Sequence, residues 1–228
     1  MSEQSLDVWA RDTARVEWGS ALAGVPAPGN ETVDEALTPK LCPIGRVLYG
    51  PNHPGRTWQL ISGFVRIDRQ GPDGEYHFSR LAMPGDWLGM EHLFGRSMGT
   101  QATTITEAIL AQVPTPRTQQ PTRELLDHLA LVEYRGAQAL SLRAGDAMER
   151  LLKLLKLLAG PQASGSVVIS MPTLQNMADI LDIRPESVSR LLRSLKSKDI
   201  LQRITRHRAV LKLDPVEFST ASLGLLAA

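Results

Sequence analysis

Residues 172–195, PTLQNMADILDIRPESVSRLLRSL, decide how the rest of this chain is interpreted. Pro172 precedes an apolar-periodic stretch, at a place where the missing N–H of proline costs a helix nothing. Four apolar residues then recur at the spacing of one helical face: Leu174, Met177, Ala178 and Leu181. Residues 182–184 (DIR) break the pattern, and Pro185 suits the first turn of a second helix whose apolar stripe is Val188, Leu191, Leu192 and Leu195. The stretch predicts a helix-turn-helix, whose second helix enters the DNA major groove by its N-terminal end.

The polar residues at the start of the second helix have the chemistry of base readers. An arginine such as Arg190 can donate two parallel hydrogen bonds to guanine O6 and N7. A glutamate such as Glu186 can accept from cytosine N4, and a serine such as Ser189 can serve several bases. Glu186 and Arg190 are four residues apart, so they share one face of the helix. An ordinary solvated helix with one Glu–Arg pair is the alternative, and the two-helix pattern argues against it.

The segment after the second helix predicts a two-stranded wing with a basic tip. Short apolar-alternating runs on either side flank residues 205–208 (TRHR), and a bland hairpin with a solvated tip is the alternative. Residues 171–215 hold nine basic and five acidic residues, a net charge of +4, whereas the whole chain carries +1. We expect this basic module to touch DNA phosphates, which position a protein without reading sequence. The residues expected to do so are Thr173, Gln175, Arg184, Ser187, Arg193, Arg206, His207 and Arg208.

Composition limits the other possibilities. With 228 residues, the chain is long enough for two modest domains with cores of their own. Its one cysteine, Cys42, leaves no internal disulfide and no cysteine cluster for zinc or an iron–sulfur centre. The sequence shows no signal segment and no apolar run near the ~18 residues of a membrane span. We therefore expect a cytoplasmic protein with no membrane partner.

The N-terminal half has the pattern of a β-rich domain. Glycine and proline recur between short β-prone runs at 47–49, 58–61, 64–67, 76–81, 103–106 and 109–113. The pair Asp73-Gly74 between two of these runs is a hairpin signal. Many short strands with regular turns predict a barrel, a roll or a sandwich. Ahead of them, residues 6–22 have roughly helical apolar spacing and predict a short helix.

Residues 122–144 predict a long helix with a heptad-like seam. The seam residues step alternately by four and three: Leu125, Leu129, Val132, Gly136 and Ala139. We expect this seam to form a homodimer, because helix-turn-helix readers bind paired half-sites about one helical turn apart. Packing of the helix on its own domain is the alternative. Gly145 then predicts a hinge, Asp146 an N-cap, and residues 147–158 a leucine-rich helix in the core of the DNA-binding domain.

This order of parts resembles the CRP/FNR superfamily of bacterial transcription regulators, from about residue 40 to residue 213. Residues 60–67 (LISGFVRI) and 81–94 (LAMPGDWLGMEHLF) are similar to the family's roll signature, and residues 186–190 (ESVSR) match the E-x-x-S-R motif of its FNR-like branch. The resemblance implies an α+β fold in four parts. They are an N-terminal helix and linker at 1–39, a double-stranded β-roll like that of cyclic-nucleotide-binding domains at 40–117, a dimerisation helix at 118–145, and a winged helix-turn-helix at 146–228.

The resemblance also implies partners. In the FNR-like branch the Glu, Ser and Arg of the motif read a TTGAT half-site, which implies an inverted repeat read by Glu186, Ser189 and Arg190. The cyclic-AMP branch has an arginine and a glycine where this chain has Pro185 and Ser189. RNA polymerase is a further expected partner. No enzymatic activity is expected, since the sequence holds no G-x-S-x-G, P-loop or H-E-x-x-H motif.

An effector pocket in the roll is implied at Trp87, Gly89, Glu91, Arg96, Thr100 and Gln101. The family's cyclic-nucleotide site uses a glutamate soon after the Gly-Asp turn and an Arg-Ser pair about ten residues later. Those Arg-Ser positions align here with Thr100 and Gln101, and Arg96-Ser97 lies four residues early. A buried phosphate without a cation is costly, so a cyclic nucleotide would need a shifted register. No cofactor is therefore predicted, and an organic effector or none at all are the remaining interpretations.

Three minor alternatives stay open. Haem could be ligated by His53, His77, His92 or Cys42, although the Cys and His positions of the family's CO-sensing members align with Gly89 and Glu91. A redox switch could use Cys42, which has Lys40 and Arg46 nearby in sequence. A cupin-like metal enzyme would have only His77, Glu91 and His92 as loose ligand candidates.

Overall fold

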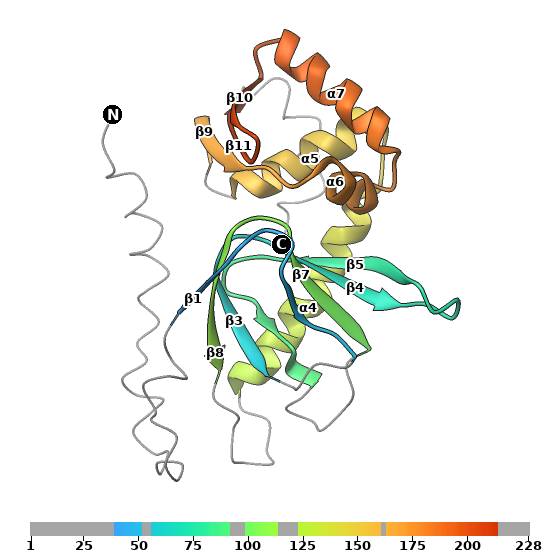
Figure 1. The fold of residues 1–228 in the computed structure, drawn as a ribbon, viewed down its shortest axis with the longest axis vertical. Coiled ribbons are helices and arrows are strands. Elements are labelled where there is room, and N and C mark those ends of the chain that lie inside the picture. The colour runs from blue at the N-terminus through green and yellow to red at the C-terminus, as the bar shows by residue number, and fades with distance from the viewer. Residues whose placement is uncertain (1–38, 52–55, 92–98, 114–122, 161–162, 214–228) are drawn as a thin grey trace.

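The computed structural model describes residues 39–51, 56–91, 99–113, 123–160 and 163–213. Strands come first, then one long helix, then a helical module that ends in a small sheet (Figure 1). The strands of the first part are β1 (Lys40–Cys42), β2 (Val47–Tyr49), β3 (Thr57–Ser62), β4 (Val65–Gln70), β5 (Tyr76–Ala82), β6 (Trp87–Leu88), β7 (Thr100–Thr104) and β8 (Ala108–Val113). The helix expected at residues 6–22 lies outside the described residues.

These strands form a β-roll, as predicted. Within the described ranges they make two four-stranded antiparallel sheets, in the orders β1-β8-β3-β6 and β2-β7-β4-β5. Residues that alternate toward the inside of the roll fill the space between the sheets, as the pleat of a strand requires. They include Tyr49, Leu60, Val65, Ile67 and Leu110. The Asp73-Gly74 pair does form the β4–β5 hairpin, with Gly74 at φ +83°.

The long helix is α4 (Arg123–Leu142), and it packs along the roll against β5. Leu125 and Val132 lie against Trp87, Met90 and Val113 of the roll. The Trp87 indole stacks on the His128 ring at a centroid distance of 4.2 Å. One side of α4 is thus committed to the chain's own core.

Helix α5 (Ala147–Ala159) begins at Asp146, as predicted. The Asp146 carboxylate accepts hydrogen bonds from the backbone N–H groups of Met148 and Glu149, and the Glu149 side chain accepts from the backbone N–H of Asp146. This reciprocal pair is a capping box. Replacing such a cap residue by alanine typically lowers the free energy of unfolding by about 1 kcal/mol. The helix buries a row of leucines in the core of the C-terminal module: Leu151, Leu152, Leu154, Leu155 and Leu158.

The remaining elements are β9 (Gly165–Ser170), α6 (Leu174–Leu181), α7 (Pro185–Ser197), β10 (Leu201–Thr205) and β11 (Arg208–Leu213). Strands β10 and β11 are the predicted wing. Strand β9 was not predicted, and it pairs with β11 in register from Ser170–Arg208 to Gly165–Leu213. It makes a three-stranded sheet in the order β10-β11-β9. In the part of the chain that the structure describes, no helix is long and apolar enough to cross a membrane.

Candidate DNA-binding surface

Helices α6 and α7 join through the turn that the sequence predicts. The Thr173 hydroxyl accepts a hydrogen bond from the backbone N–H of Asn176 and caps the start of α6. Asp182 ends α6 in the left-handed conformation at φ 54°, which Asp tolerates better than most residues. Pro185 occupies the first turn of α7. Val188 and Leu195 are buried, so the opposite side of α7 must face outward.

The predicted base readers lie on that outward side. Glu186 and Arg190 are both exposed. Neither side chain makes an ion pair or hydrogen bond with any residue that the structure describes. Ser189 is half-buried, and its carbonyl accepts a 3.5 Å contact from Arg193 Nε. Glu186 and Arg190 are therefore two unpaired charges of opposite sign in the first turns of α7. The buried apolar side of α7 fixes the helix against its own module.

The wing tip is basic and braced from within. Arg206 and Arg208 are exposed, while His207 is half-buried. The Arg203 guanidinium donates to the carbonyls of Thr205 at 3.2 Å and Arg206 at 2.8 Å, which fixes the path of the tip. We did not predict this role of Arg203, although a basic residue two positions ahead of a basic tip was a signal for it.

The other residues expected at phosphates are placed in different ways. Thr173 already serves as a cap, and Gln175 Nε2 donates to Asp179 Oδ1 at 2.7 Å. Arg184 and Arg193 are exposed on α7 or at its start, and Ser187 is half-buried. All these side chains belong to the two helices or to the turn between them, so the structure brings them together on one module.

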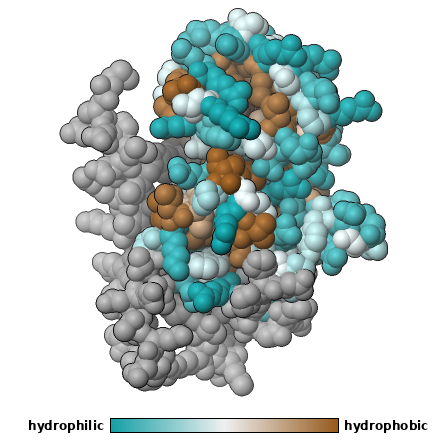
Figure 2. Space-filling model, viewed as in Figure 1, coloured by the Kyte–Doolittle hydropathy of each residue, from teal (hydrophilic) through white to brown (hydrophobic). Residues whose placement is uncertain are grey.

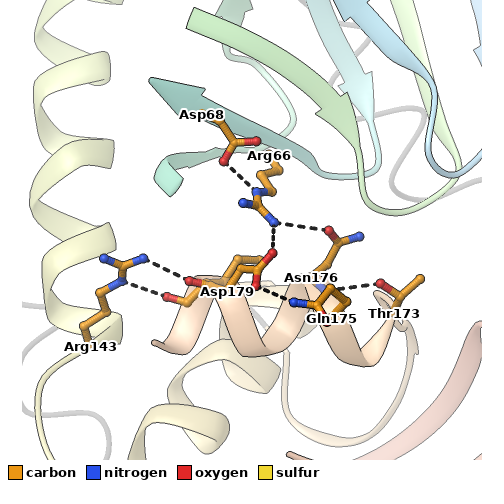
Figure 3. A network of polar contacts seen from close by, with 8 residues as sticks. Arg66, Asp68, Arg143, Thr173, Gln175, Asn176 and Asp179 are labelled. Carbon is orange, nitrogen blue, oxygen red and sulfur yellow. Dashed lines mark hydrogen bonds and ion pairs between the residues drawn. The ribbon is translucent and has the colours of Figure 1, made fainter. Parts of the chain in front are cut away.

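Two arginines from neighbouring elements hold the C-terminal end of α6, and Figure 3 shows the first of them, Arg143. Arg143, just after α4, donates to the carbonyls of Ile180 at 3.1 Å and Asp179 at 2.9 Å. Arg150 of α5 donates to the carbonyl of Leu181 at 3.1 Å. The last carbonyls of a helix lack partners within the helix and carry partial negative charge, so cations there are stabilising. These contacts could not be predicted from the residues of α6, because its own last turn has no basic residue and the cations come from distant positions.

A third arginine reaches α6 from the roll (Figure 3). Arg66 of β4 donates from Nη1 to Asp179 Oδ2 at 2.5 Å and from Nε to Asp68 Oδ1 at 2.6 Å. Burial opposes the charge of Arg66, but its hydrogen bonds to Asp179 and Asp68 outweigh that and hold the guanidinium pKa above its usual value. Burial dominates at Asp68 and raises the pKa of its carboxyl even though Arg66 lowers it.

Comparison with known proteins agrees with this arrangement. Residues 149–217 match the model of the Crp-like helix-turn-helix domain. The nitrogen fixation regulation protein FixK of Rhizobium meliloti is 32% identical over 160 residues, which are 69% of this chain and 74% of FixK. The chain belongs to the CRP/FNR family. It is a transcription regulator with a helix-turn-helix DNA-binding domain.

Two solved structures share the fold of this CRP/FNR regulator. A CRP-family transcriptional regulator from Thermus thermophilus superimposes with a TM-score of 0.67 at 23% identity, covering 83% of this chain and 99% of that one. FixK2 from Bradyrhizobium japonicum gives a TM-score of 0.63 at 22% identity, covering 84% and 98%. The predicted fold class, a β-roll followed by a long helix and a winged helix-turn-helix, is confirmed.

Three of the expected effector residues of the CRP/FNR regulator make hydrogen bonds within the described part of the roll. Thr100 Oγ1 donates to Glu91 Oε1 at 3.0 Å, and the Gly89 carbonyl accepts from Thr57 at 3.2 Å. Trp87 is buried and Gln101 half-buried.

Arg96 lies outside the described residues, as do His53 and His92. His77 pairs with Asp73 at 2.9 Å at the exposed hairpin tip, and Cys42 is half-buried on β1. The described residues include no group of three His, Cys, Asp or Glu side chains placed to hold a metal ion.

Two further buried polar residues of the roll were not predicted. Tyr49 is 2% exposed, and burial raises its pKa to about 12. Arg80 of β5 is 11% exposed, and its Nη1 lies 3.9 Å from Asp86 Oδ2 without a hydrogen-bond partner among the described residues. Asp86 also receives Arg135 of α4 at 3.2 and 3.3 Å and the backbone N–H of Met83 at 3.0 Å. This cluster ties the long helix to the roll.

The expected seam on α4 needs a correction in register. Leu125 and Ala139 are buried within the chain's own core, and Val132 packs against the roll. Only Leu129 and Gly136 of the expected set have open space, with Leu129 42% exposed. The apolar residues that α4 leaves outward are Leu126, Leu129, Ala130, Tyr134, Ala137 and Leu140. Intramolecular packing on the roll takes the side that the heptad pattern had marked for a partner.

Proposed function

We propose that this CRP/FNR regulator binds an inverted-repeat operator as a homodimer, with TTGAT-like half-sites read by Glu186, Ser189 and Arg190. The observation that carries the proposal is the state of Glu186 and Arg190. Both are exposed and unpaired among the described residues, at the N-terminal end of the second helix of the helix-turn-helix. That is the end of the helix that reaches base edges. Their spacing matches E-x-x-S-R, so each has a base partner by ordinary hydrogen-bond chemistry.

Phosphate contacts would come from the module's other cations. Arg184, Arg193, Arg206 and Arg208 are exposed around α7 and the wing. Phosphate contacts fix register without reading sequence, so these residues supply affinity and Glu186 with Arg190 supply specificity. We propose RNA polymerase as a further partner of the DNA-bound protein.

In-vitro selection from a random DNA pool by the purified full chain tests the proposal. We expect enrichment of paired, inverted TTGAT-like half-sites. Enrichment of a different half-site would overturn the assignment of the readers, and single unpaired half-sites would overturn the dimer. The absorption spectrum of the same preparation, recorded beforehand, shows whether a haem Soret band accompanies the DNA-binding form.

The dimer is proposed to form through the outward apolar side of α4. Leu140 is 75% exposed and Leu126 53% exposed, which is unusual for leucines spaced along one helix side. An isologous pairing of two α4 helices would bury both at once. We expect Leu140→Asp to sediment as a monomer and to bind the operator weakly. Leu41→Asp, at a leucine 66% exposed on β1, is the matched control and should remain dimeric.

A ligand in the roll is a second proposal, favoured by one observation. Arg80 Nη1, Trp87 Nε1 and Tyr76 Oη are buried and lack hydrogen-bond partners among the described residues. Buried polar atoms without partners are rare, and a bound anion at Arg80 would supply a partner for its guanidinium. Cyclic AMP, cyclic GMP and inorganic phosphate should be tested for a rise in Tm with the wild type and with Arg80→Met. A rise in the wild type that Arg80→Met abolishes would support the proposal, and no rise with any of them would count against an anion at Arg80.

A further inference from the structure

Arg66 belongs to the roll, yet the DNA-binding module holds its guanidinium (Figure 3). It donates to Asp179 Oδ2 at 2.5 Å and contacts Asn176 Oδ1 at 3.5 Å, both on α6 and more than a hundred residues away in sequence. The Arg66 side chain is 13% exposed and that of Asp179 33%. Water screens a pair this enclosed less than it screens a surface pair.

Asp179, in the first helix of the helix-turn-helix, accepts hydrogen bonds both from the roll and from its own module. Its Oδ2 accepts from Arg66 and its Oδ1 from Gln175, while its backbone carbonyl accepts from Arg143. Arg143 in turn lies over the ring of Phe78 of the roll, with Cζ 5.3 Å from the ring centroid. A rotation of α6 relative to the roll would break the Arg66 bond, because that bond is directional and joins a side chain of the roll to a side chain of α6.

The side-chain hydrogen bonds to the connection between α4 and α5 come from α5 and do not reach the roll: Arg150 Nε donates to the Gly145 carbonyl and Lys153 Nζ to the Ala144 carbonyl, each at 2.9 Å. Residues 143–146 form a turn, and Gly145 adopts φ 91°. Apolar packing between the roll and the module, through Phe78, Leu81 and Ile105, is not directional. A guanidinium fork between two carboxylates has a defined geometry, and moving it would leave largely buried charges unpaired.

We propose that Arg66 is a positioning residue for DNA recognition, whose pairing with Asp179 sets the orientation of the helix-turn-helix on the roll and thereby the half-site spacing that the dimer accepts. The inference rests on the proposed dimeric reading of an inverted repeat. Two recognition helices reach half-sites about one helical turn apart only if each is held at a fixed angle to the dimer. A module free to rotate must be ordered at the moment of binding, which lowers affinity for the best spacing and relaxes discrimination against others.

The test compares Arg66→Met and Asp179→Asn with two matched controls. Arg69→Met removes a cation from the same strand, at an exposed side chain for which the described residues show no ion pair. Asp199→Asn removes an acid whose partner, Lys212, lies in the same module, at φ 60° where asparagine is well tolerated. Binding of each full-length variant is measured on a single half-site and on inverted repeats whose spacer differs by one or two base pairs in either direction.

We expect Arg66→Met and Asp179→Asn to lose about 5- to 20-fold in affinity for the best spacing, in the range of ordinary coupling between sites. Their preference for that spacing should flatten, with single half-site affinity unchanged and Arg66→Lys restoring part of the preference. An equal loss on every DNA, or wild-type spacing preference in both variants, overturns the inference. Equal affinity of the wild-type protein for every spacer length also overturns the inference. Its affinity for the single half-site shows separately whether the proposed readers recognise their bases. Should Arg66→Met melt below the assay temperature, the isosteric Asp179→Asn decides.

Discussion

Charged side chains of the roll and of the DNA-binding module differ in whether the fold buries and pairs them. In the roll and along α4, the buried Asp86 pairs with Arg135. Arg66 of the roll is also largely buried and pairs with Asp68 and Asp179. On α7 and the wing, Glu186 and Arg206 are exposed, and no side-chain ion pair reaches them from the described residues. On the face drawn in Figure 2, hydrophilic residues cover much of the upper part of the molecule, and hydrophobic patches lie both there and near the middle. The difference indicates which residues can recognise DNA. Charges that are paired within the protein stabilise its fold, and charges that remain unpaired are available to DNA.

Removing Asp86 should give the largest change in stability. Asp86→Ala would leave the guanidiniums of Arg135 and Arg80 enclosed without their carboxylate, and breaking a buried pair typically costs about 3–5 kcal/mol. Asp127→Ala is the control, because Asp127 is 74% exposed and 4.0 Å from Arg123. Urea unfolding measures both. If Asp86→Ala lost no more stability than the control, the paired half of the comparison would be broken.

Tyr49 should make the stability of the roll depend on alkaline pH. Burial holds its pKa at about 12 in the folded state, above the ordinary tyrosine value of 10.0, so the folded state keeps the phenol proton to higher pH than the unfolded state does. Its contribution is fully present below pH 10 and is lost as pH rises toward 12, a loss on the order of 3 kcal/mol. The free energy of unfolding measured between these limits should fall with pH in the wild type and fall less in Tyr49→Phe. Parallel curves for the two proteins would contradict a buried, neutral Tyr49.

Arg190→Ala should act on DNA binding and leave the fold alone. Loss of a bidentate contact to guanine costs about 1–3 kcal/mol per half-site and relaxes preference at one base pair. Fluorescence anisotropy on the selected operator and on its single-base variants measures both effects, and thermal unfolding should be unchanged because Arg190 is exposed. An equal loss on all sequences would make Arg190 a phosphate contact rather than a reader.

Arg206→Ala should have the smallest effect. The exposed wing tip would lose one phosphate contact per module, so binding should weaken similarly on every sequence. The slope of log K against log[salt] should become shallower by about one per contact removed. Arg69→Ala on the roll gives the reference slope. A slope equal to that reference would remove Arg206 from the DNA contacts.

The recognition helices could be predicted from the sequence because their signals are local. Pro185 fixes the first turn of α7, and Asp182 accepts the left-handed conformation that ends α6. Asp146 and Glu149 form a capping box within three residues of one another. Each of these interactions closes within one or two helical turns, so no distant part of the chain is needed to choose it.

The missed features depend on residues far apart in the chain. Strand β9 (Gly165–Ser170) exists because β11, some forty residues later, pairs with it. Helix α4 is apolar on more than one side, so tertiary packing and not periodicity decides that Leu125 faces inward and Leu126 outward. The Arg66–Asp179 pair joins the two halves of the chain, and nothing near either residue in sequence indicates its partner.

The arginines that end α6 affect how this protein can be recombined with others. The helices of the DNA-binding module start at the Asp146 cap. Arg143 lies upstream of that cap, yet it donates hydrogen bonds to the carbonyls of Asp179 and Ile180 in α6. A chimera that grafts this unit onto a foreign sensor should therefore carry the chain from Arg143 onward, or supply an equivalent cation at the graft. The hydrogen bonds thus place the start of the transferable DNA-binding unit at Arg143, ahead of the start at Asp146 that secondary structure alone would give.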